Sequence, residues 1–530
     1  MNKLIFALIA ISIISCTNQK SDSTSVSRDF EEDMLQLKEY FHIPGLAILV
    51  KKDGKTLYEN YFGYADLETQ QPLDSTSMFP IASITKTFSA VLLQQLVEEG
   101  KLDLEEPINL YLEGSSLSDS IKIKHVLSHT SEGEPGSFFN YSSRFFLLTR
   151  VIEKSASASL VELMNSKIID PLNLKNTVPL IDQTVIAARE DQLAKPYYFY
   201  GEVEAGHYDS GLSAASGLAS TLRDLARFDN ALDSDQLISG ESKNQMFSPF
   251  NSDLAFPYGY GIFTQNFTAK EIKWGYGQED CFSSLLLKVP EDNITLILLA
   301  NNNLMSDPPR LINGDLSYSR FALSFLKHFV FELPETYKSM DYTKPESLDI
   351  EQIQANPDLG KLYRQELLAN AIAASFMGQV DSLELQRSKE LTEIALREFP
   401  DYAQYGNQSL MRLLMVLANF GGYDEFDEAF VDLGNLLLEK NQFDPYTNVY
   451  LGYYYQNRNQ AEKAFQYFNT IAETPNLQPF WYSIEAFDFL GDYYKNDNPE
   501  LARTYYQKIV DIGWNMGGKL DKAKTELERL

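Results

Sequence analysis

The sequence predicts an α+β domain followed by an all-α, repeat-like domain, because strand and helix patterns are unevenly distributed along its 530 residues. Strand-like runs occur near residues 46–62 and return at residues 260–300, with helix-like patterns between them. From about residue 350 strand patterns stop and helical patterns continue to the end. A single sheet that unites the two ends of residues 29–335 accounts for the first part.

The composition excludes several classes of protein. Hydrophobic residues make up 44% and aromatic residues 13%, which is enough apolar material for real cores. Lys and Arg number 45 against 74 Asp and Glu, so the net charge is −29 and we expect no nucleic-acid partner. The five histidines are scattered, and neither HExxH nor CxxC occurs, so we expect no metal site. No other cofactor is expected.

The N-terminus predicts export and anchoring. Lys3 precedes a short apolar run that ends in Ile13-Ile14-Ser15-Cys16. This pattern resembles a bacterial lipoprotein signal, which implies a signal peptide at residues 1–15, lipidation of Cys16 and a flexible tether at residues 16–28. The protein would then be held at a membrane of the cell envelope, facing the periplasm or the cell surface. The alternative is an ordinary secretory signal with a chance cysteine.

The first domain, residues 29–335, is predicted element by element. Residues 29–41 carry an apolar stripe at helical spacing, and Asp53-Gly54 joins two strand-like runs as a hairpin. The expected strands are residues 46–51, 56–62, 260–265, 283–289 and 295–300, and the expected helices are residues 29–41, 84–99, 142–154, 159–169 and 318–331.

After a Pro-containing linker at residues 336–349, residues 350–530 form the predicted helical domain. Leu451-Gly452-Tyr453 is echoed by Leu490-Gly491-Asp492, 39 residues later. Small residues at fixed places let paired helices approach closely. The pattern resembles tetratricopeptide-type repeats, and such a surface could bind a protein partner. A non-repetitive helical bundle is the alternative.

One short motif carries the chemistry. In Ser83-Ile84-Thr85-Lys86 the serine and lysine lie one turn apart on the same face, at the start of an apolar-periodic helix. The helix N-terminus directs N–H groups towards Ser83. A partly desolvated lysine at this position can act as a base near neutral pH.

With this motif the sequence resembles the serine β-lactamase and penicillin-binding-protein superfamily, in particular the class C β-lactamase-like serine hydrolases. The matching segments, in order, are residues 44–47, 83–86, 126–131, 139–143, 214–221 and 274–290. The resemblance implies a β-lactamase-like antiparallel sheet flanked by helices over roughly residues 30–330. His129 would be structural, and Glu132 and Glu134 are interpreted as part of a solvated loop.

The resemblance also implies site residues. Ser83 would be the acylated nucleophile, Lys86 its hydrogen-bonded partner, and Tyr141 a second proton carrier whose phenol pKa is lowered by Lys86. Ser143 occupies the place of the family's usual Asn, which touches substrate and lysine. The oxyanion hole would use the backbone N–H of Ser83 and of a residue on a late strand.

The third motif departs from the family's Lys-Thr-Gly or His-x-Gly. The preferred register places Gly275 at the usual cation position, followed by Tyr276 and Gly277, and gives the oxyanion N–H to Gln278. The other register, Lys273-Trp274-Gly275, keeps a cation and shifts the strand by two residues. Without a cation, the site would lack a grip on a substrate carboxylate.

The sequence therefore predicts a serine hydrolase that acts on small-molecule or peptide acyl substrates, as an esterase, amidase or peptidase-like enzyme without a required carboxylate. Two alternatives stay open. The chain could be a binding or sensor protein with a degenerate hydrolase fold, or a scaffold that acts through its helical repeats.

Overall fold

In the computed structural model, a seven-stranded antiparallel sheet joins the two ends of the first domain. The structure describes residues 22–115, 117–253, 257–333, 337, 353, 355–474 and 477–530. The strand order is β3-β2-β1-β12-β11-β10-β9. The strands are β1 (Gly45–Lys52), β2 (Lys55–Asp66), β3 (Gln71–Pro72), β9 (Phe263–Phe267), β10 (Lys270–Glu279), β11 (Phe282–Val289) and β12 (Ile294–Ala300). The central pair, β1 and β12, aligns Leu46 with Ala300, so the N- and C-terminal parts share one sheet as predicted.

The hairpin between β1 and β2 forms as the sequence predicts. Asp53 and Gly54 form its turn with φ values of 50° and 72°, the left-handed conformation that a tight two-residue turn requires. Residues 46–50 are buried because both faces of β1 are covered. Leu46, Ile48 and Val50 pack into one core, and the alternate Ala47 and Leu49 into another.

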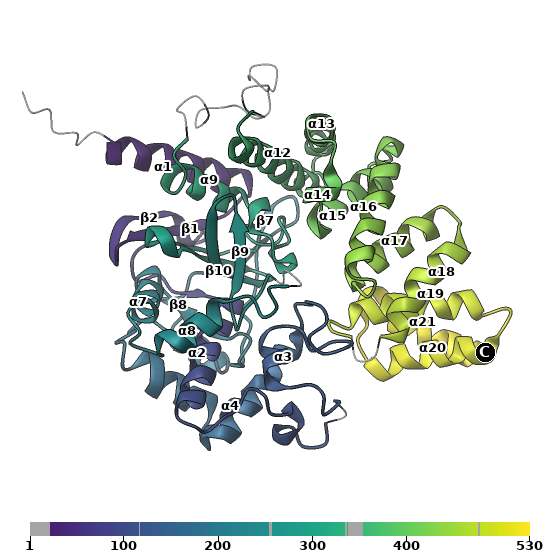
Figure 1. Cartoon of the computed structure of the whole chain (residues 1–530), viewed down its shortest axis with the longest axis horizontal. Helices are drawn as coiled ribbons and strands as arrows, with labels where there is room; N and C mark the ends of the chain where they lie inside the picture. The colour runs from purple at the N-terminus through teal and green to yellow at the C-terminus, as the bar shows by residue number, and fades with distance from the viewer. Residues whose placement is uncertain are drawn as a thin grey trace, which may run out of the picture.

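Helices cover both faces of the sheet (Figure 1). On one side lie α1 (Asp22–Tyr40) and α9 (Arg320–Phe329), and on the other lie α2 (Thr85–Glu98), α4 (Leu148–Ala156), α7 (Leu222–Asp233) and α8 (Gly240–Phe247). The remaining short elements of this domain are α3 (Ile123–Leu127), α5 (Leu160–Met164), α6 (Gln183–Ala188), β4 (Phe79–Pro80), β5 (Val178–Pro179), β6 (Tyr197–Phe199), β7 (Val203–Ala205) and β8 (Leu218–Ser220). The helix predicted at residues 142–154 begins with a 3-10 turn at Ser143–Leu147.

A buried carboxylate ties α7 to three strands. Asp229, which is 1% exposed, lies 2.5 Å from the Lys51 ammonium of β1, pairs with Lys288 of β11, and accepts a hydrogen bond of 3.0 Å from Thr295 of β12. Burial alone would raise the pKa of Asp229, but the ammonium groups of Lys288 and Lys51 outweigh it and hold the pKa below its usual value.

Asp229→Asn is expected to destabilise the protein by about 3–5 kcal/mol, because it leaves two buried ammonium groups with too little negative charge. Thermal unfolding should show a melting temperature lower by about 10 °C. The control is Asp233→Asn, since Asp233 pairs with the same lysines but is 49% exposed and should change stability far less. Equal losses in the two variants would contradict this account.

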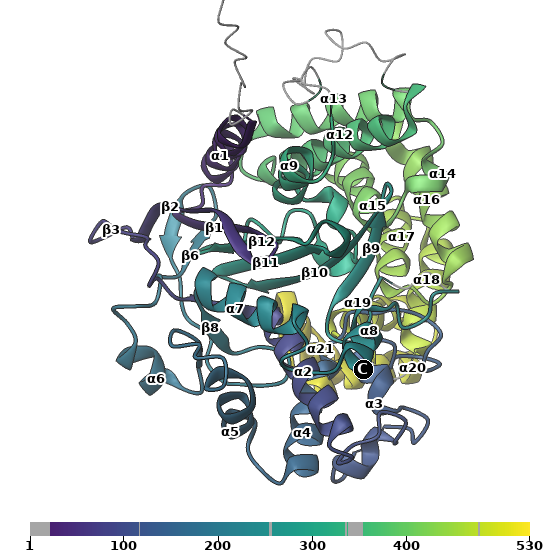
Figure 2. The ribbon, with the colours of Figure 1, turned by 60° about the vertical axis from the view of Figure 1, so that its left-hand side comes forward.

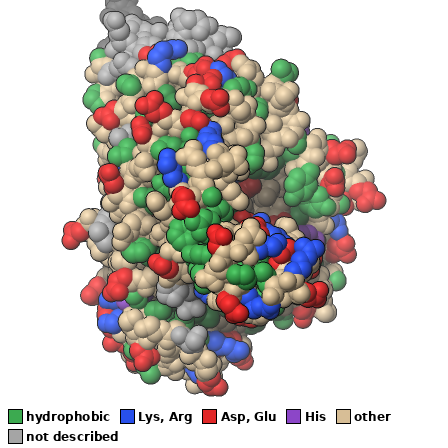
Figure 3. Space-filling model, turned by 90° about the vertical axis from the view of Figure 1, so that its right-hand side faces the viewer, with side chains coloured by type: hydrophobic (Ala, Val, Ile, Leu, Met, Phe, Trp, Pro, Cys, Tyr) green, Lys and Arg blue, Asp and Glu red, His purple; other side chains and the backbone are tan. Residues whose placement is uncertain are grey.

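The C-terminal region is a series of helices that curves around the β9 side of the sheet (Figure 2). Its helices are α12 (Pro357–Met377), α13 (Ser382–Glu398), α14 (Tyr402–Tyr405), α15 (Gln408–Met415), α16 (Asp427–Lys440), α17 (Pro445–Asn457), α18 (Ala461–Glu473), α19 (Trp481–Tyr494), α20 (Pro499–Ile512) and α21 (Lys519–Arg529). One hydrophobic core runs through α9, α12, α15 and α17, so this region is joined to the first domain by packing. Acidic side chains are spread over the face that it presents (Figure 3).

The two copies noticed in the sequence pack in the same way. A Cβ on Gly452 of α17 would lie 2.8 Å from the Phe468 ring of α18, and one on Gly491 of α19 would lie 2.6 Å from the Tyr506 ring of α20. Each glycine therefore lets a helix rest on an aromatic ring of its partner. The same kind of helix pair therefore occurs twice, which fits the expected repeats. The tetratricopeptide assignment and the domain boundaries stay predictions.

The signal peptide at residues 1–15, the lipidation site Cys16 and the linker at residues 336–349, apart from Tyr337, lie outside the described residues. The expected flexible tether at residues 16–28 is wrong for residues 22–28, which form the start of α1, while residues 16–21 are not described. The envelope location stays a prediction. Within the part of the chain that the structure describes, no helix has the length and apolar character needed to cross a membrane.

Candidate active site

Ser83 lies on a tight turn between β4 and α2. The turn is a 3-10 helix, Ala82–Ile84, and Ala82 is held at φ 45°, a left-handed conformation that costs a residue with a side chain about 1–2 kcal/mol. The turn is held from two sides, since Ile81 N–H donates to Leu218 O at 2.9 Å and Ser284 Oγ donates to Ile81 O at 2.9 Å. The strained backbone presents the Ser83 side chain at the start of α2, partly open to solvent.

Lys86 points back to Ser83 from the first turn of α2. Its Nζ lies 2.8 Å from Ser83 Oγ and 3.1 Å from Ala215 O. Lys86 is 5% exposed, and no carboxylate is recorded within ion-pair distance of it among the described residues. Burial lowers the pKa of Lys86 to about 7, so a large share of the amine is neutral at physiological pH and can accept a proton.

Tyr141 is the third predicted catalytic side chain, beside Ser83 and Lys86. The Lys86 ammonium lies 5.0 Å from the centre of its ring, and the Ser83 and Tyr276 hydroxyls interact with its phenol. The prediction that Lys86 lowers the pKa of Tyr141 is wrong. Burial raises the pKa of this phenol, and its interactions with the Ser83 and Tyr276 hydroxyls offset only part of that effect. Tyr141 is therefore protonated at neutral pH and suited to donate a proton.

The segment that carries Tyr141 is held from behind by His129. The His129 ring stacks on Tyr141 with centroids 4.2 Å apart, and its Nδ1 accepts a hydrogen bond of 2.9 Å from Ser142 N–H. Burial, together with the nearby Lys86, holds the pKa of His129 well below its usual value, so the imidazole is neutral. This agrees with the structural role that the resemblance implies.

Glu132 is a supporting residue that the sequence did not reveal. The expected solvated loop is wrong for this residue, which is fully buried, while Glu134 is exposed. Its carboxylate accepts hydrogen bonds from Ser142 and from Ser131, and lies 3.5 Å from Arg144 Nε. It therefore fixes the residue that follows Tyr141.

Strand β10 passes directly over the nucleophile turn. A Cβ on Gly277 would lie 2.2 Å from Ile81 O and 3.0 Å from Ala82 Cβ, so only glycine allows this approach. Gly275 lies two residues earlier on the same face, and a Cβ added there would have Thr87 Oγ1, at 3.6 Å, as its nearest neighbour. This geometry matches the preferred register of the third motif.

The alternative register does not match. Lys273 lies beyond Gly275 along β10, and its Nζ bonds to Phe247 O at 2.6 Å, to Thr264 Oγ1 at 2.8 Å and to Glu271 at 2.6 Å. These partners satisfy the ammonium away from Ser83. Lys273 is therefore not available to Ser83, and the assignment of Gly275 to the cation position of the motif stays a prediction.

Gln278 presents its backbone at an unpaired edge. A two-residue turn joins Glu279 to Phe282, which makes that pair hydrogen-bonded and the next pair, Gln278 with Ser283, non-hydrogen-bonded. The Gln278 N–H therefore points away from β11, and β9 pairs with β10 only as far as Trp274. This is the orientation that an oxyanion donor needs. The Gln278 side chain is held in place because its Nε2 donates a hydrogen bond of 3.0 Å to Asp307 Oδ1.

Tyr276 is a second residue that the motifs did not reveal. It lies between Gly275 and Gly277, so its side chain points to the opposite face of β10, where it joins Phe263, Trp274 and Tyr141. Its ring centroid lies 5.8 Å from that of Tyr141, so the two phenols influence each other's pKa. Sequence spacing could not show this, because the two tyrosines are 135 positions apart.

Ser143 is brought to the same side of the chain as Tyr141, since the backbone between them is extended. Its hydroxyl donates a hydrogen bond of 3.0 Å to the Gln478 carboxamide oxygen, and Asn140 Nδ2 donates to Gln478 O at 2.7 Å. Gln478 belongs to the C-terminal region, so the two regions meet beside the predicted site. No group of three or more His, Cys, Asp or Glu residues suited to a metal ion occurs among the described residues.

Comparison with known proteins identifies the family. A family model described as beta-lactamase matches residues 32–315, more than half of the 530 residues. Penicillin-binding protein 4* of Bacillus subtilis is 27% identical over 338 residues, which cover 54% of this chain and 72% of that protein. Protein flp of Staphylococcus aureus strain MW2 is 25% identical over 306 residues, or 49% of this chain. That match covers 60% of protein flp, so the chain spans less than two thirds of its length.

Two solved structures show similarity to the first part of the chain. The octameric penicillin-binding protein homologue from Pyrococcus abyssi has a TM-score of 0.49 and 22% identity, with 57% of this chain and 77% of that chain covered. The D-amino acid amidase from Ochrobactrum anthropi SV3 has a TM-score of 0.46 and 21% identity, with 52% and 91% covered. The helical region after residue 315 lies outside the family match.

Proposed function

The chain belongs to the beta-lactamase family of serine hydrolases, and on this premise we propose that it hydrolyses ester or amide substrates through an acyl-enzyme on Ser83. The observation that carries the proposal is the hydrogen bond of 2.8 Å between Ser83 Oγ and a lysine whose pKa is lowered to about 7. A neutral amine at this distance can take the serine proton as the hydroxyl attacks.

The acylation step uses the three side chains in turn. Ser83 Oγ forms a bond to the substrate carbonyl carbon while its proton passes to Lys86 Nζ, and the carbonyl oxygen becomes an oxyanion. The backbone N–H groups of Ser83 and Gln278 stabilise that charge. As the carbonyl carbon loses its leaving group, the protonated Tyr141 hydroxyl donates a proton to that group, and Lys86 returns a proton to the phenolate.

Deacylation reverses the same transfers. Water attacks the acyl carbon, gives up a proton to Lys86, and the bond between the carbon and Ser83 Oγ breaks as Oγ regains a proton. The products are a carboxylic acid and the free enzyme. The neutral amine of Lys86 is therefore needed in both steps.

This role predicts the pH dependence of the reaction. Because the protonated amine cannot accept a proton, kcat/KM for a nitrophenyl ester should fall about tenfold per pH unit below about pH 7 and level off above it. The measurement is a pH–rate profile between pH 5 and 9, corrected for the buffer hydrolysis of the ester. A profile that rises only near the ordinary lysine pKa would refute Lys86 as the base.

The proposed substrates are acyl donors that need no carboxylate, because Gly275 leaves the cation position without a charge. Gly275→Lys is expected to raise kcat/KM for an acyl donor with a free carboxylate about tenfold relative to its methyl ester. A Cβ at Gly275 would meet only Thr87 Oγ1, at 3.6 Å, so the first side-chain carbon fits without displacing a neighbour. The matched control is Gly275→Met, which adds similar bulk without charge and should leave this ratio unchanged.

A second candidate is a binding or sensor protein on a degenerate hydrolase fold, which the uncharged Gly275 favours. It predicts that the protein binds acyl compounds without releasing them as acids. Turnover of a nitrophenyl ester that depends on Ser83 would exclude this candidate.

A further inference from the structure

The loop that follows β12 lies against the strand that carries the predicted oxyanion donor. In this β12 loop, residues 301–313, Ser306 Oγ donates a hydrogen bond of 3.1 Å to Gly277 O. The next residue, Asp307, accepts a hydrogen bond of 3.0 Å from Gln278 Nε2. The Gly277 carbonyl and the Gln278 N–H belong to one planar peptide unit, so a bond that fixes the carbonyl also fixes the direction of the N–H. The β12 loop therefore sets the aim of the oxyanion donor.

The β12 loop is covered in turn by the C-terminal region. Ser409 Oγ of α15 donates a hydrogen bond of 3.4 Å to Pro309 O and accepts one of 3.2 Å from Asn313 Nδ2. The Arg310 guanidinium lies 5.3 Å from the centre of the Tyr446 ring of α17, a cation–π contact. Two helices of the C-terminal region therefore hold the end of a loop whose middle holds β10.

Arg310 occupies a strained position in the β12 loop. Its backbone has φ 51°, a left-handed conformation that costs a residue with a side chain about 1–2 kcal/mol. Its N–H closes a turn by donating to Asp307 O at 3.1 Å, while its Nε is buried and has no hydrogen-bond partner among the described residues. Tyr450 and Tyr482 also interact electrostatically with the guanidinium. Aromatic side chains of the C-terminal region are thus the main support of this turn.

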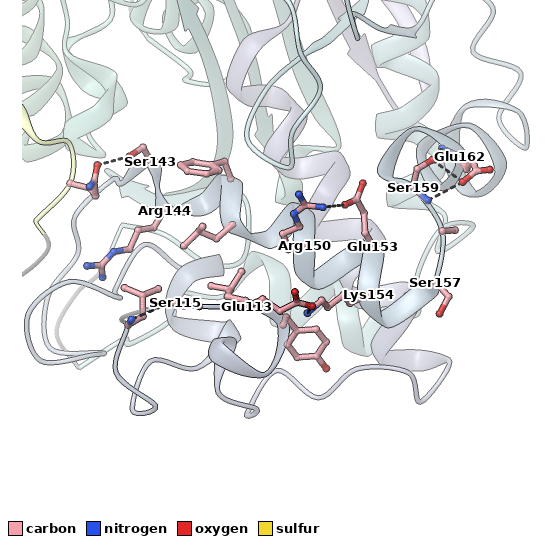
Figure 4. A pocket seen from close by; sticks show the side chains of 18 of the residues that line it. Glu113, Ser115, Ser143, Arg144, Arg150, Glu153, Lys154, Ser157, Ser159 and Glu162 are labelled. Carbon is pink, nitrogen blue, oxygen red and sulfur yellow. Dashed lines mark hydrogen bonds and ion pairs between the residues drawn. The ribbon is translucent and has the colours of Figure 1, made fainter. Parts of the chain in front are cut away.

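The C-terminal region also touches the segment that carries Tyr141. Ser143 donates a hydrogen bond of 3.0 Å to the Gln478 carboxamide, and Figure 4 shows Ser143 joined in this way to the C-terminal region at one end of a groove. Neither Ser83 nor Lys86 nor Tyr141 lines that groove. The contact therefore steadies the Tyr141 segment, as the β12 loop steadies the strand that carries the oxyanion donor.

We propose that Arg310 is a positioning residue for the oxyanion donor Gln278, and that the C-terminal region holds Arg310 in place through Tyr446. The inference rests on the proposed function and gives the helical region a part in it. Without the ring of Tyr446 the turn from Asp307 to Arg310 relaxes, and the two bonds to β10 loosen. Because the oxyanion forms only after the substrate has bound, the loss falls on kcat and leaves KM nearly unchanged.

The test measures kcat and KM for nitrophenyl acetate in the full-length protein. Tyr446→Leu removes the ring and should lower kcat about tenfold with KM within about twofold, since loss of a whole oxyanion donor costs about 10²–10³ in kcat and a misdirected donor costs part of that. Arg310→Met should lower kcat by a similar factor, and the double variant should be little worse than either, because the two residues act as a unit. Tyr446→Phe keeps the ring, Arg310→Lys keeps a cation over it, and both should retain most of the wild-type kcat.

A tetrahedral analogue separates positioning from a general loss of structure. When a trifluoromethyl ketone binds, Ser83 Oγ forms a bond to its carbonyl carbon, the Oγ proton passes to Lys86, and the ketone oxygen becomes an oxyanion. The inhibition constant should rise about tenfold in Tyr446→Leu and in Arg310→Met, in step with the fall in kcat. The transition near pH 7 in the pH–rate profile should stay in place, because neither variant changes Lys86.

Tyr423→Leu is the matched control, because Lys389 Nζ lies 5.4 Å from the centre of the Tyr423 ring, a second cation–π pair of the C-terminal region. It should leave kcat and the inhibition constant unchanged. Gln278→Met reaches the same link without touching the C-terminal region. It keeps the backbone N–H, loses the side-chain bond to Asp307, and should also lower kcat about tenfold.

The outcomes separate this inference from the proposed function. A wild type that is active, with kcat and the inhibition constant unchanged in Tyr446→Leu and Arg310→Met, would overturn the positioning role alone. Equal losses in Tyr446→Leu and Tyr423→Leu, or a wild-type kcat in Gln278→Met, would do the same. A wild type without Ser83-dependent turnover would overturn the proposed function and this inference together.

Discussion

Ser83→Ala is expected to lower kcat/KM for a nitrophenyl ester by about 10⁴-fold or more, because it removes the atom that forms the acyl bond. The residual rate would come from the oxyanion donors and from binding alone. Lys86→Met should cause a loss of similar size, since without a neutral amine the Ser83 hydroxyl keeps its proton. The double variant should be little worse than either single one, because the two residues act as a unit.

The matched control for this experiment is Ser137→Ala, which removes an exposed hydroxyl that only bonds to Glu134 O. It should retain wild-type turnover. Losses in Ser83→Ala and Lys86→Met that multiply in the double variant would show that the two residues act independently. Persistent turnover in Ser83→Ala would assign the activity to a different group.

The second large effect is expected for Gly277→Ala. The added Cβ would lie 2.2 Å from both Ile81 O and Ser284 Oγ, so the turn that carries Ser83 must shift. A shift of this kind misplaces the nucleophile relative to Lys86 and Gln278, and kcat/KM should fall about 100-fold. Overpacking at one site costs about 1–3 kcal/mol, so the variant should remain folded, which thermal melting can verify.

Gly275→Ala is the control, because it adds the same methyl group to the same face of β10, where the nearest atom lies 3.6 Å away. It should retain nearly the full rate. Because the two variants differ only by position, they also test the register of the third motif. Similar rates in Gly277→Ala and Gly275→Ala would show that β10 does not press on the nucleophile turn.

Much of this site could be predicted from local sequence, because its parts are set by local rules. The spacing of Ser83 and Lys86 on one helical turn survives in the structure, and the hairpin at Asp53-Gly54 follows from its turn residues. Counting along a strand whose period is two also predicts the preferred register of β10, and the close approach of Gly277 to the nucleophile turn supports it. The proximity of Tyr141 to Ser83 could be predicted only from the family resemblance, because the two residues are 58 positions apart in the sequence.

Features that depend on long-range packing could not be predicted. The raised pKa of Tyr141 results from burial among aromatic rings of other segments, which no single motif encodes. Glu132 is buried because Ser142 and Arg144 fold back on it, although its Gly- and Pro-containing neighbourhood is typical of a solvated loop. Gln478 meets Ser143 across 335 positions, through a junction between two regions.

The most direct test of the account is mass spectrometry of the protein after reaction with a fluorophosphonate, which phosphonylates activated serine hydroxyls. We expect one adduct, on the peptide that contains Ser83, and no labelling of Ser83→Ala or of wild type at a pH well below that of the Lys86 transition. An unmodified protein at pH 8, or an adduct on any other peptide, would contradict the claim that Ser83 is a nucleophile activated by Lys86.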